Sequence, residues 1–236
     1  MKNLKNKVAV ITGGNSGIGY ATAKALNENG AKVIITGRRK EAIEKAASEL
    51  NVSSLLADQS SLSDIENLVE KVKEDFGKVD VLLINAGITK FAPIELMTEN
   101  MFDEIMNVNF KGAYFTLSKF IPILNDHASV ILLSSTSATI SPQSASVYAA
   151  SKAALNAVMK IAALELSSRK IRVNAVSPGP VATEIMNKLG LDPAVENQII
   201  SSIPLSRLGK ADEVADLITY LSGDSASFIT GSNFHH

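Results

Sequence analysis

The chain contains no cysteine, and neither sign of charge is in marked excess. The lack of cysteine excludes disulfides and thiolate metal sites and fits a reducing interior. Twenty-three basic residues against 24 acidic ones give a formal net charge of −1, so no broad basic field attracts nucleic acid. Long apolar runs of the roughly 20 residues that a membrane span requires are missing, as is a secretory signal. We therefore expect a cytoplasmic protein that binds neither nucleic acid nor membrane.

Histidine is also scarce, with three in the chain. His127 lies in a polar stretch and is expected to face solvent, and His235 and His236 have no further ligands near them in sequence. The sequence therefore predicts no metal site.

The 236 residues are enough for one sizeable α/β domain, and short β-branched runs alternate with helical patterns along the chain. This alternation predicts a single-domain, Rossmann-type, doubly wound parallel sheet of about seven strands with helices on both faces. The strands are expected at residues 7–12, 32–36, 53–57, 79–84, 129–134 and 172–176, with a short last one near Phe228. The helices are expected at residues 18–29, 40–50, 62–76, 98–106, 109–123, 147–168 and 211–221.

A glycine loop follows the first expected strand, with Gly13, Gly17 and Gly19 leading into the first helix. Glycine permits a sharp turn and lets main-chain N–H groups approach a pyrophosphate at a helix N-terminus. The loop lacks the Gly-Lys-Ser/Thr ending of a triphosphate site. The alternative is a strand-to-helix turn that binds nothing.

Tyr148 and Lys152 are spaced four apart, which places both on one face of the expected helix. An ammonium beside a phenol favours the phenolate, so we expect a lowered tyrosine pKa and proton transfer near neutral pH. Ser135 follows the apolar run 130–133 and is expected at a strand's carboxyl end. There its hydroxyl can donate a hydrogen bond to a substrate carbonyl oxygen, the same oxygen that the tyrosine protonates. The alternative is a chance pair and a serine that serves a turn.

The second expected strand ends at Gly37, where a protein that binds NAD would carry an acid for the ribose 2′-hydroxyl. Arg38 follows, and its guanidinium offers planar donors and a permanent charge to a 2′-phosphate. NADP(H) is therefore the expected cofactor, with NAD(H) possible. The alternative is that Arg38 and Arg39 are a solvated pair heading the next helix.

Five candidate residues, Gly13, Asp58, Asn85, Ser135 and Pro178, each fall just past an expected strand end, where ligands bind in parallel sheets. The motifs in order are Thr12-Gly13-x-x-x-Gly17-x-Gly19, Asn85-Ala86-Gly87, Ser135, Tyr148-x-x-x-Lys152 and Pro178-Gly179. From Lys7 to about Gly231 the chain resembles a classical short-chain dehydrogenase/reductase.

This resemblance implies a role for each matching residue. Tyr148 would be the acid/base, Lys152 would hold the nicotinamide ribose and lower the tyrosine pKa, and Ser135 would polarise the carbonyl. Asn109 matches the fourth catalytic position, where it would anchor a water, and its spacing to Gly112 favours it over Asn107. The cofactor-binding residues would be Gly13, Asn15, Ser16, Gly17, Ile18, Gly19, Arg38, Arg39, Asp58, Asn85, Ala86, Gly87, Tyr148, Lys152, Pro178, Gly179, Val181 and Thr183. Two alternatives remain: Asn85 closes a turn, or Thr183 caps the following helix.

By the same resemblance, the chain would interconvert a carbonyl and an alcohol, with the apolar segment 181–206 as a lid, and would form a homotetramer or homodimer. One alternative is a 3-oxoacyl-[acyl-carrier-protein] reductase. The segment 124–128 lacks basic residues for an acidic carrier, although Arg169, Lys170 and Arg172 keep that alternative open. The other alternative is a non-catalytic NADP-sensing protein with the same fold.

Overall fold

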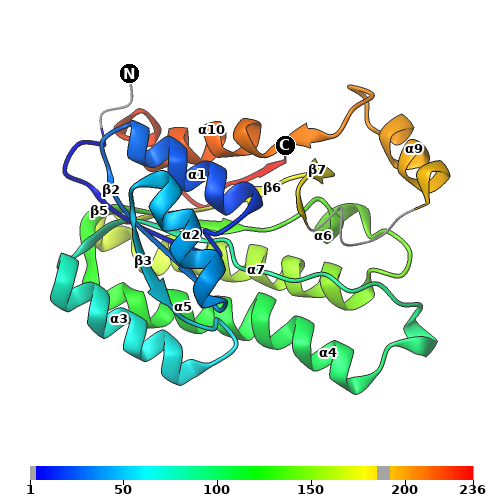
Figure 1. Cartoon of the computed structure of the whole chain (residues 1–236), viewed down its shortest axis with the longest axis horizontal. Helices are drawn as coiled ribbons and strands as arrows, with labels where there is room; N and C mark the ends of the chain where they lie inside the picture. Colours follow the sequence, from blue (N-terminus) through cyan, green and yellow to red (C-terminus); the bar gives the residue numbers. More distant parts are fainter. Residues whose placement is uncertain (1–3, 185–191, 236) are drawn as a thin grey trace.

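The computed structural model describes residues 4–184 and 192–235 and contains a seven-stranded parallel sheet flanked by helices (Figure 1). The sheet order is β3-β2-β1-β4-β5-β6-β9. The strands are β1 Val8–Thr12, β2 Lys32–Gly37, β3 Ser53–Leu56, β4 Val79–Ile84, β5 Leu124–Leu133, β6 Arg172–Ser177 and β9 Asn233–His235. A separate two-stranded pair joins β7 Val181–Ala182 to β8 Gly209–Lys210. The order reverses direction at β1 and β4, which opens a crevice beyond their carboxyl ends.

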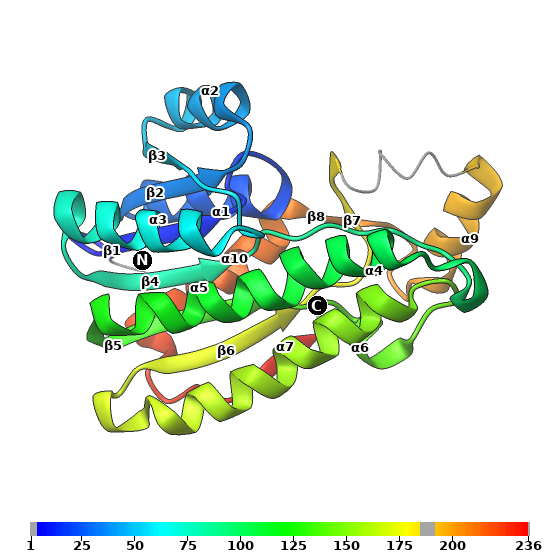
Figure 2. The same cartoon turned by 90° about the horizontal axis from the view of Figure 1, so that it is seen from below.

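Helices cover both faces of this sheet (Figure 2). They are α1 Gly17–Glu28, α2 Lys40–Leu50, α3 Leu62–Phe76, α4 Glu99–Met106, α5 Ala113–Phe120, α6 Ser137–Ile140, α7 Ser146–Glu165, α9 Pro193–Ser202 and α10 Ala211–Ser222. Helices α1, α2 and α10 contribute to the core on one face, and α3, α5 and α7 to the core on the other. A π-helix, η2 Asn107–Gly112, joins α4 to α5, and short 3₁₀ turns occur at Ile94–Leu96, Ile121–Ile123, Ser167–Arg169 and Asp224–Ala226.

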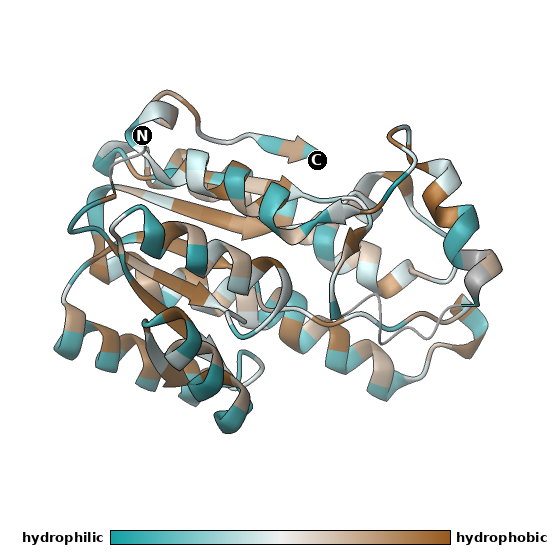
Figure 3. Cartoon of the chain, turned by 45° about the horizontal axis from the view of Figure 1, so that its top comes forward, coloured by the Kyte–Doolittle hydropathy of each residue, from teal (hydrophilic) through white to brown (hydrophobic). Residues whose placement is uncertain are grey.

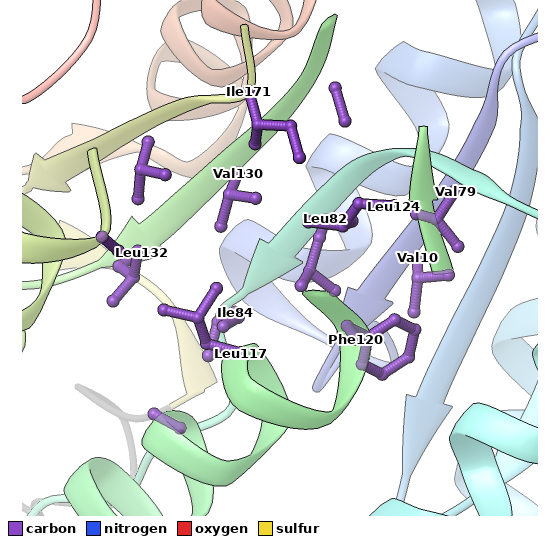
Figure 4. Packing of buried hydrophobic residues seen from close by; sticks show 14 of the residues in the cluster. Val10, Val79, Leu82, Ile84, Leu117, Phe120, Leu124, Val130, Leu132 and Ile171 are labelled. Atoms are coloured by element: carbon purple, nitrogen blue, oxygen red, sulfur yellow. The ribbon is translucent and has the colours of Figure 1, made fainter. Parts of the chain in front are cut away.

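The central strands are apolar over most of their buried positions because both of their faces are covered. In β4, Val81 and Leu83 belong to the core beneath α1 and α10, whereas Leu82 and Ile84 belong to the opposite core. On that second face Phe120 is fully buried against the sheet (Figure 4). Complete burial of each such side chain contributes about 1.5–3 kcal/mol, so this packing fixes the relative positions of the strand ends.

Figure 3 shows the resulting pattern, with hydrophobic strands inside and hydrophilic residues on the outer sides of the helices. Within the described ranges, α7 alone is long and apolar enough by length and composition to cross a membrane. Its Leu155 and Met159 are buried in the core, and the helix packs on β6, which is the arrangement of a core helix.

Three expected boundaries are wrong. The last strand lies at residues 233–235, where it pairs with β6, and Phe228 is fully exposed in a loop. Strand β5 begins at Leu124 because its first residue pairs with Val79 across a register shift. The expected break between the helices ending at 106 and starting at 109 is a π-helix instead, so the helical path continues.

Candidate functional site

The glycine loop joins β1 to α1 at the crevice. Gly13 and Gly17 have φ angles of 67° and 54°, in the left-handed region that disfavours a side chain. A Cβ at Gly17 would lie 3.3 Å from the Thr183 Cγ2, so the loop is also closely approached. Ser16 occupies the N-cap of α1, yet its side chain makes no capping hydrogen bond. A cradle with glycine at its narrow points and free N-terminal donors fits the pyrophosphate of a dinucleotide.

Asn85 fixes this loop from the end of β4. Its Nδ2 donates to the main-chain oxygens of Thr12 at 2.8 Å and Gly13 at 3.0 Å. The Thr12 Oγ1 in return accepts from the main-chain N–H groups of Asn85 and Ala86, each at 3.0 Å. These contacts support the alternative in which Asn85 closes the turn, because both amide hydrogens are used within the protein.

At the end of β2, Gly37 lies against the same loop. A Cβ there would be 3.1 Å from the Asn15 Oδ1, so a larger residue would displace the asparagine. Arg38 and Arg39 follow on the exposed surface, and neither forms an ion pair within residues 4–184 and 192–235. Asp58 lies half-buried just past β3. The four positions bring two free guanidinium groups and one carboxylate to the outer end of the crevice.

Tyr148 and Lys152 stand on successive turns of α7, and Ser135 follows β5, as the motif spacing predicts. The Ser135 side chain lies close enough to the Tyr148 phenol to affect its pKa. Lys152 is 4% exposed, and its Nζ donates to the Leu133 main-chain oxygen at 2.8 Å. The same ammonium lies over the Tyr148 ring, 5.8 Å from its centroid. A phenol, a hydroxyl and an ammonium thus meet at the carboxyl edge of the sheet.

The pKa values in this group differ from the sequence expectation. Burial lowers the pKa of Lys152 to about 8. The pKa of Tyr148 is raised above its ordinary value, because desolvation by burial outweighs the opposing effect of the Ser135 hydrogen bond. The expected lowering of the tyrosine pKa is therefore not found in this structure: the ammonium faces the ring and a main-chain carbonyl, and burial disfavours the phenolate.

Asn109 is 1% exposed on the π-helix η2. Its Oδ1 accepts from the Ile88 N–H at 2.8 Å, and its Nδ2 donates to the Ile88 oxygen at 2.9 Å and to the Ser151 Oγ at 3.2 Å. A Cβ at Gly87 would lie 3.3 Å from the Asn109 Oδ1 and 3.5 Å from the Lys152 Nζ, so glycine lets these two groups approach one loop. A π-helix often marks a functional position because it redirects a side chain.

The segment after β6 borders the site on the remaining side. The Pro178 oxygen accepts from the Thr136 N–H at 3.0 Å and from its Oγ1 at 3.3 Å, which ties the segment to the residue after Ser135. Val181 begins β7, and Thr183 lies against Gly17 of the glycine loop. Of the expected lid at 181–206, α9 is observed, whereas Ile185, Met186, Leu189 and Leu191 lie outside the described residues.

Two residues near the site belong to no recognisable sequence motif. Phe91 packs edge-on against Tyr148, with ring centroids 6.3 Å apart and an interplanar angle of 70°, and it remains 43% exposed. Gln59, next to Asp58, is buried between the loop after β4 and the π-helix η2. A phenylalanine and a glutamine in loops carry no spacing signal, so only the tertiary structure reveals them.

The basic residues considered for a carrier protein lie elsewhere. Arg172 opens β6, and Arg169 and Lys170 precede it, so all three stand at the amino-terminal edge of the sheet, opposite Tyr148. Segment 124–128 starts β5 at the same edge and does not bear on access to the site. Among the described residues no group of His, Cys, Asp and Glu side chains is arranged to hold a metal.

Comparison with known proteins agrees with this geometry. Residues 13–236 match the family model described as Enoyl-(Acyl carrier protein) reductase. The chain is 37% identical over 235 residues to a 3-oxoacyl-[acyl-carrier-protein] reductase of Thermotoga maritima, which covers 97% of this chain and 95% of that protein.

Two solved structures from Brucella melitensis are similar throughout. A short-chain dehydrogenase/reductase described as a glucose/ribitol dehydrogenase has a TM-score of 0.95 and 30% identity, covering 100% of this chain and 96% of that one. A 3-ketoacyl-(acyl-carrier-protein) reductase complexed with NADH has a TM-score of 0.92 and 34% identity, and the match covers 98% of this chain and 97% of that one. The chain belongs to the short-chain dehydrogenase/reductase family of oxidoreductases, as its motifs predict.

Proposed function

We propose that this chain is an NADP(H)-dependent oxidoreductase that interconverts a ketone or aldehyde and the corresponding alcohol. The observation that carries the proposal is the meeting of the Tyr148 phenol, the Ser135 hydroxyl and the Lys152 ammonium beside a glycine loop that fits a dinucleotide. The bound nicotinamide supplies or accepts the hydride at the carbonyl carbon.

The residues of the chain transfer the proton and stabilise the negative charge that develops on the carbonyl oxygen. In reduction, Tyr148 donates its phenolic proton to the carbonyl oxygen as negative charge develops there, while Ser135 donates a hydrogen bond to the same oxygen. Lys152 is assigned to the nicotinamide ribose, because its ammonium is not among the causes that shift the tyrosine pKa. Asn109, held against the main chain of Ile88, anchors the water through which the proton is replaced.

NADP(H) is the proposed cofactor because Gly37 leaves no carboxylate to repel a 2′-phosphate, and Arg38 and Arg39 stand exposed directly after it. A guanidinium gives a phosphate two parallel donors as well as charge. The pyrophosphate side is assigned to the glycine loop and Thr183, and the adenine side to Asp58. Pro178, Gly179 and Val181 shape the nicotinamide side, and residues 181–206 act as the lid over the substrate in one catalytic domain.

A cytoplasmic homodimer or homotetramer is proposed. The outward face of α7 supports self-association, because most of its exposed residues are apolar and several are small enough to allow close helix approach. The exposed residues of this helix are Ala150, Ala153, Ala157, Lys160, Ile161, Leu164 and Glu165.

The acyl-carrier alternative has the Thermotoga maritima relative in its favour. Against it, the basic residues that were to receive an acidic carrier stand at the opposite edge of the sheet from Tyr148. A non-catalytic sensor is disfavoured because it would not need Ser135, Tyr148, Lys152 and Asn109 gathered at one place.

The test is the loss of nicotinamide absorbance with NADPH and, in parallel, with NADH across free ketones, aldehydes and 3-oxoacyl thioesters. Turnover of a free carbonyl compound with NADPH preferred is the expected result. Turnover restricted to carrier-bound thioesters would select the alternative. Tight NADPH binding without turnover on any substrate would favour the sensor.

A further inference from the structure

Gln59 joins the loop after β4 to the π-helix η2 through its side-chain amide. It is 7% exposed in the connection between β3 and α3. Its Nε2 donates to the Ala86 main-chain oxygen and to the Val108 main-chain oxygen, each at 3.0 Å. The acceptors lie 27 and 49 residues further along the chain, so one amide connects three separate segments.

Only the donor half of this amide is used. The Gln59 Oε1 is buried and has no hydrogen-bond partner in the part of the chain that the structure describes. A buried acceptor without a partner is costly, and an apolar side chain of similar length would avoid that cost. That apolar side chain would instead leave the Ala86 and Val108 carbonyls without the donor that Gln59 supplies. The position is therefore built for two donated hydrogen bonds, not merely for filling space.

Both acceptors belong to segments that carry proposed site residues. Ala86 lies between Asn85 and Gly87 after β4, and Val108 immediately precedes Asn109 on η2. The far end of η2 also rests on Gln59, because a Cβ at Gly112 would be 2.0 Å from the Gln59 main-chain oxygen. The loop after β4, residues 85–88, is called the β4 loop. Both the side chain and the main chain of Gln59 thus limit how far η2 can move from the β4 loop.

The next contacts lead to the reacting groups. Asn109 is hydrogen-bonded through both side-chain polar atoms to the main chain of Ile88, which follows Gly87. Gly87 in turn lies against both the Asn109 Oδ1 and the Lys152 Nζ. If the Gln59 hydrogen bonds are lost, the β4 loop and η2 can separate. Gly87 then no longer holds the Asn109 and Lys152 side chains in their relative positions.

We propose that Gln59 is a positioning residue that holds the β4 loop against η2 and so sets the placement of Asn109 relative to Lys152; its catalytic consequence rests on the proposed function. A displacement of about 1 Å at a reacting group is enough to cost up to about a hundredfold in rate. The hydrogen bonds of the Gln59 side chain go to Ala86 and Val108, so we expect it to act on the rate and on proton transfer through the segments that carry these two residues.

The test compares the wild type with Gln59→Met, which keeps side-chain length and removes both donors, and with the milder Gln59→Asn, which shortens the reach. Steady-state kinetics give kcat, KM and the pH dependence of kcat, and NMR hydrogen exchange follows the Ile88 amide, which donates to Asn109. For Gln59→Met we expect kcat to fall about tenfold or more, the midpoint of the kcat–pH profile to move, and exchange at Ile88 to accelerate. Gln59→Asn should show the same changes to a smaller extent.

Asn174→Leu is the matched control. Asn174 is also a fully buried amide that bridges main-chain groups, donating to the Ile229 oxygen at 2.9 Å and accepting from the Ser232 N–H at 3.1 Å, but it lies on β6 beside the last strand. Its loss should lower the melting temperature without changing the kcat–pH profile or the exchange of Ile88.

The outcomes separate the two proposals. Unchanged kcat, pH profile and Ile88 exchange in both Gln59 variants would overturn the positioning role. So would changes that merely match those of Asn174→Leu. If the wild type turns over no substrate while Ile88 exchange still accelerates in Gln59→Met alone, the positioning geometry stands and the proposed function fails.

Discussion

The Lys152 ammonium donates a 2.8 Å hydrogen bond to the main-chain oxygen of Leu133, the last residue of β5. This contact ties the helix that carries Tyr148 directly to the sheet edge that carries Ser135. It also holds a cation in a buried place, and no ion pair to Lys152 occurs within residues 4–184 and 192–235. The buried Lys152 ammonium therefore lowers the free energy of unfolding, and this decrease can be measured.

Lys152→Met should change how stability depends on pH. The folded-state pKa of Lys152, about 8, lies below its ordinary value of 10.5, so burial penalises the charged form. Below pH 8 both states are protonated and the full penalty applies. Between pH 8 and 10.5 the unfolded chain binds more protons, so the free energy of unfolding of the wild type should rise relative to the variant by on the order of 3 kcal/mol. Urea unfolding of both proteins from pH 7 to 10 measures this difference, and parallel curves would contradict it.

Tyr148→Phe should abolish turnover and leave cofactor binding nearly intact. The variant retains the ring that packs against Phe91 and loses only the proton donor. General acid catalysis accounts for about 10²- to 10⁴-fold, so kcat should fall by at least about a hundredfold. NADPH fluorescence titration should give a dissociation constant close to that of the wild type. Turnover at the wild-type rate would remove Tyr148 as the acid/base.

Ser135→Ala should move the pH profile of alcohol oxidation toward higher pH. The Ser135 hydrogen bond lowers the pKa of Tyr148 against the larger raising effect of burial, so its removal raises that pKa further. Oxidation requires the phenolate, hence the rate rises as pH passes the tyrosine pKa. Initial rates across pH 6–11, compared with the exposed-site control Ser167→Ala, test this. A midpoint that stays in place or falls would show that Ser135 does not act on the phenol.

Arg38→Ala should weaken NADPH binding far more than NADH binding. A hydrogen bond to a charged group contributes about 1.5–3 kcal/mol, so the NADPH dissociation constant should rise about 10- to 100-fold while that for NADH barely changes. Lys45→Ala on α2 removes another surface cation, one that pairs with Glu49, and serves as the control. Equal losses for both cofactors would sink the argument for a 2′-phosphate site.

Much of the fold follows from local sequence. Residues 8–11 and 81–84 are apolar on both faces, as expected of a parallel strand that is covered on both sides. Glycine at position 30 has the left-handed φ that ends α1. The last strand does not follow from local sequence, because Asn233–His235 is short and polar. It is extended through its pairing with β6, a contact that no local pattern contains.

The site was predictable where spacing carries the chemistry, as at Tyr148 and Lys152. Its electrostatics were not, because burial depends on the whole fold, and it is burial that reverses the expected sign for the pKa of Tyr148. Gln59 carries no signal in the sequence for the same reason: a glutamine after an aspartate predicts nothing until β3, β4 and η2 are brought together.

The sheet order has a consequence for how the protein acquires its structure. All strand neighbours in the main sheet are parallel, so none is joined to its neighbour by a tight hairpin. Pairings such as Val10 with Leu82 and Ala175 with Asn233 close long loops, and high contact order slows folding relative to helical bundles. During synthesis β6 remains an open edge until residues 233–235 leave the ribosome, so the nascent chain is exposed to misassociation along β6 until β9 has been made.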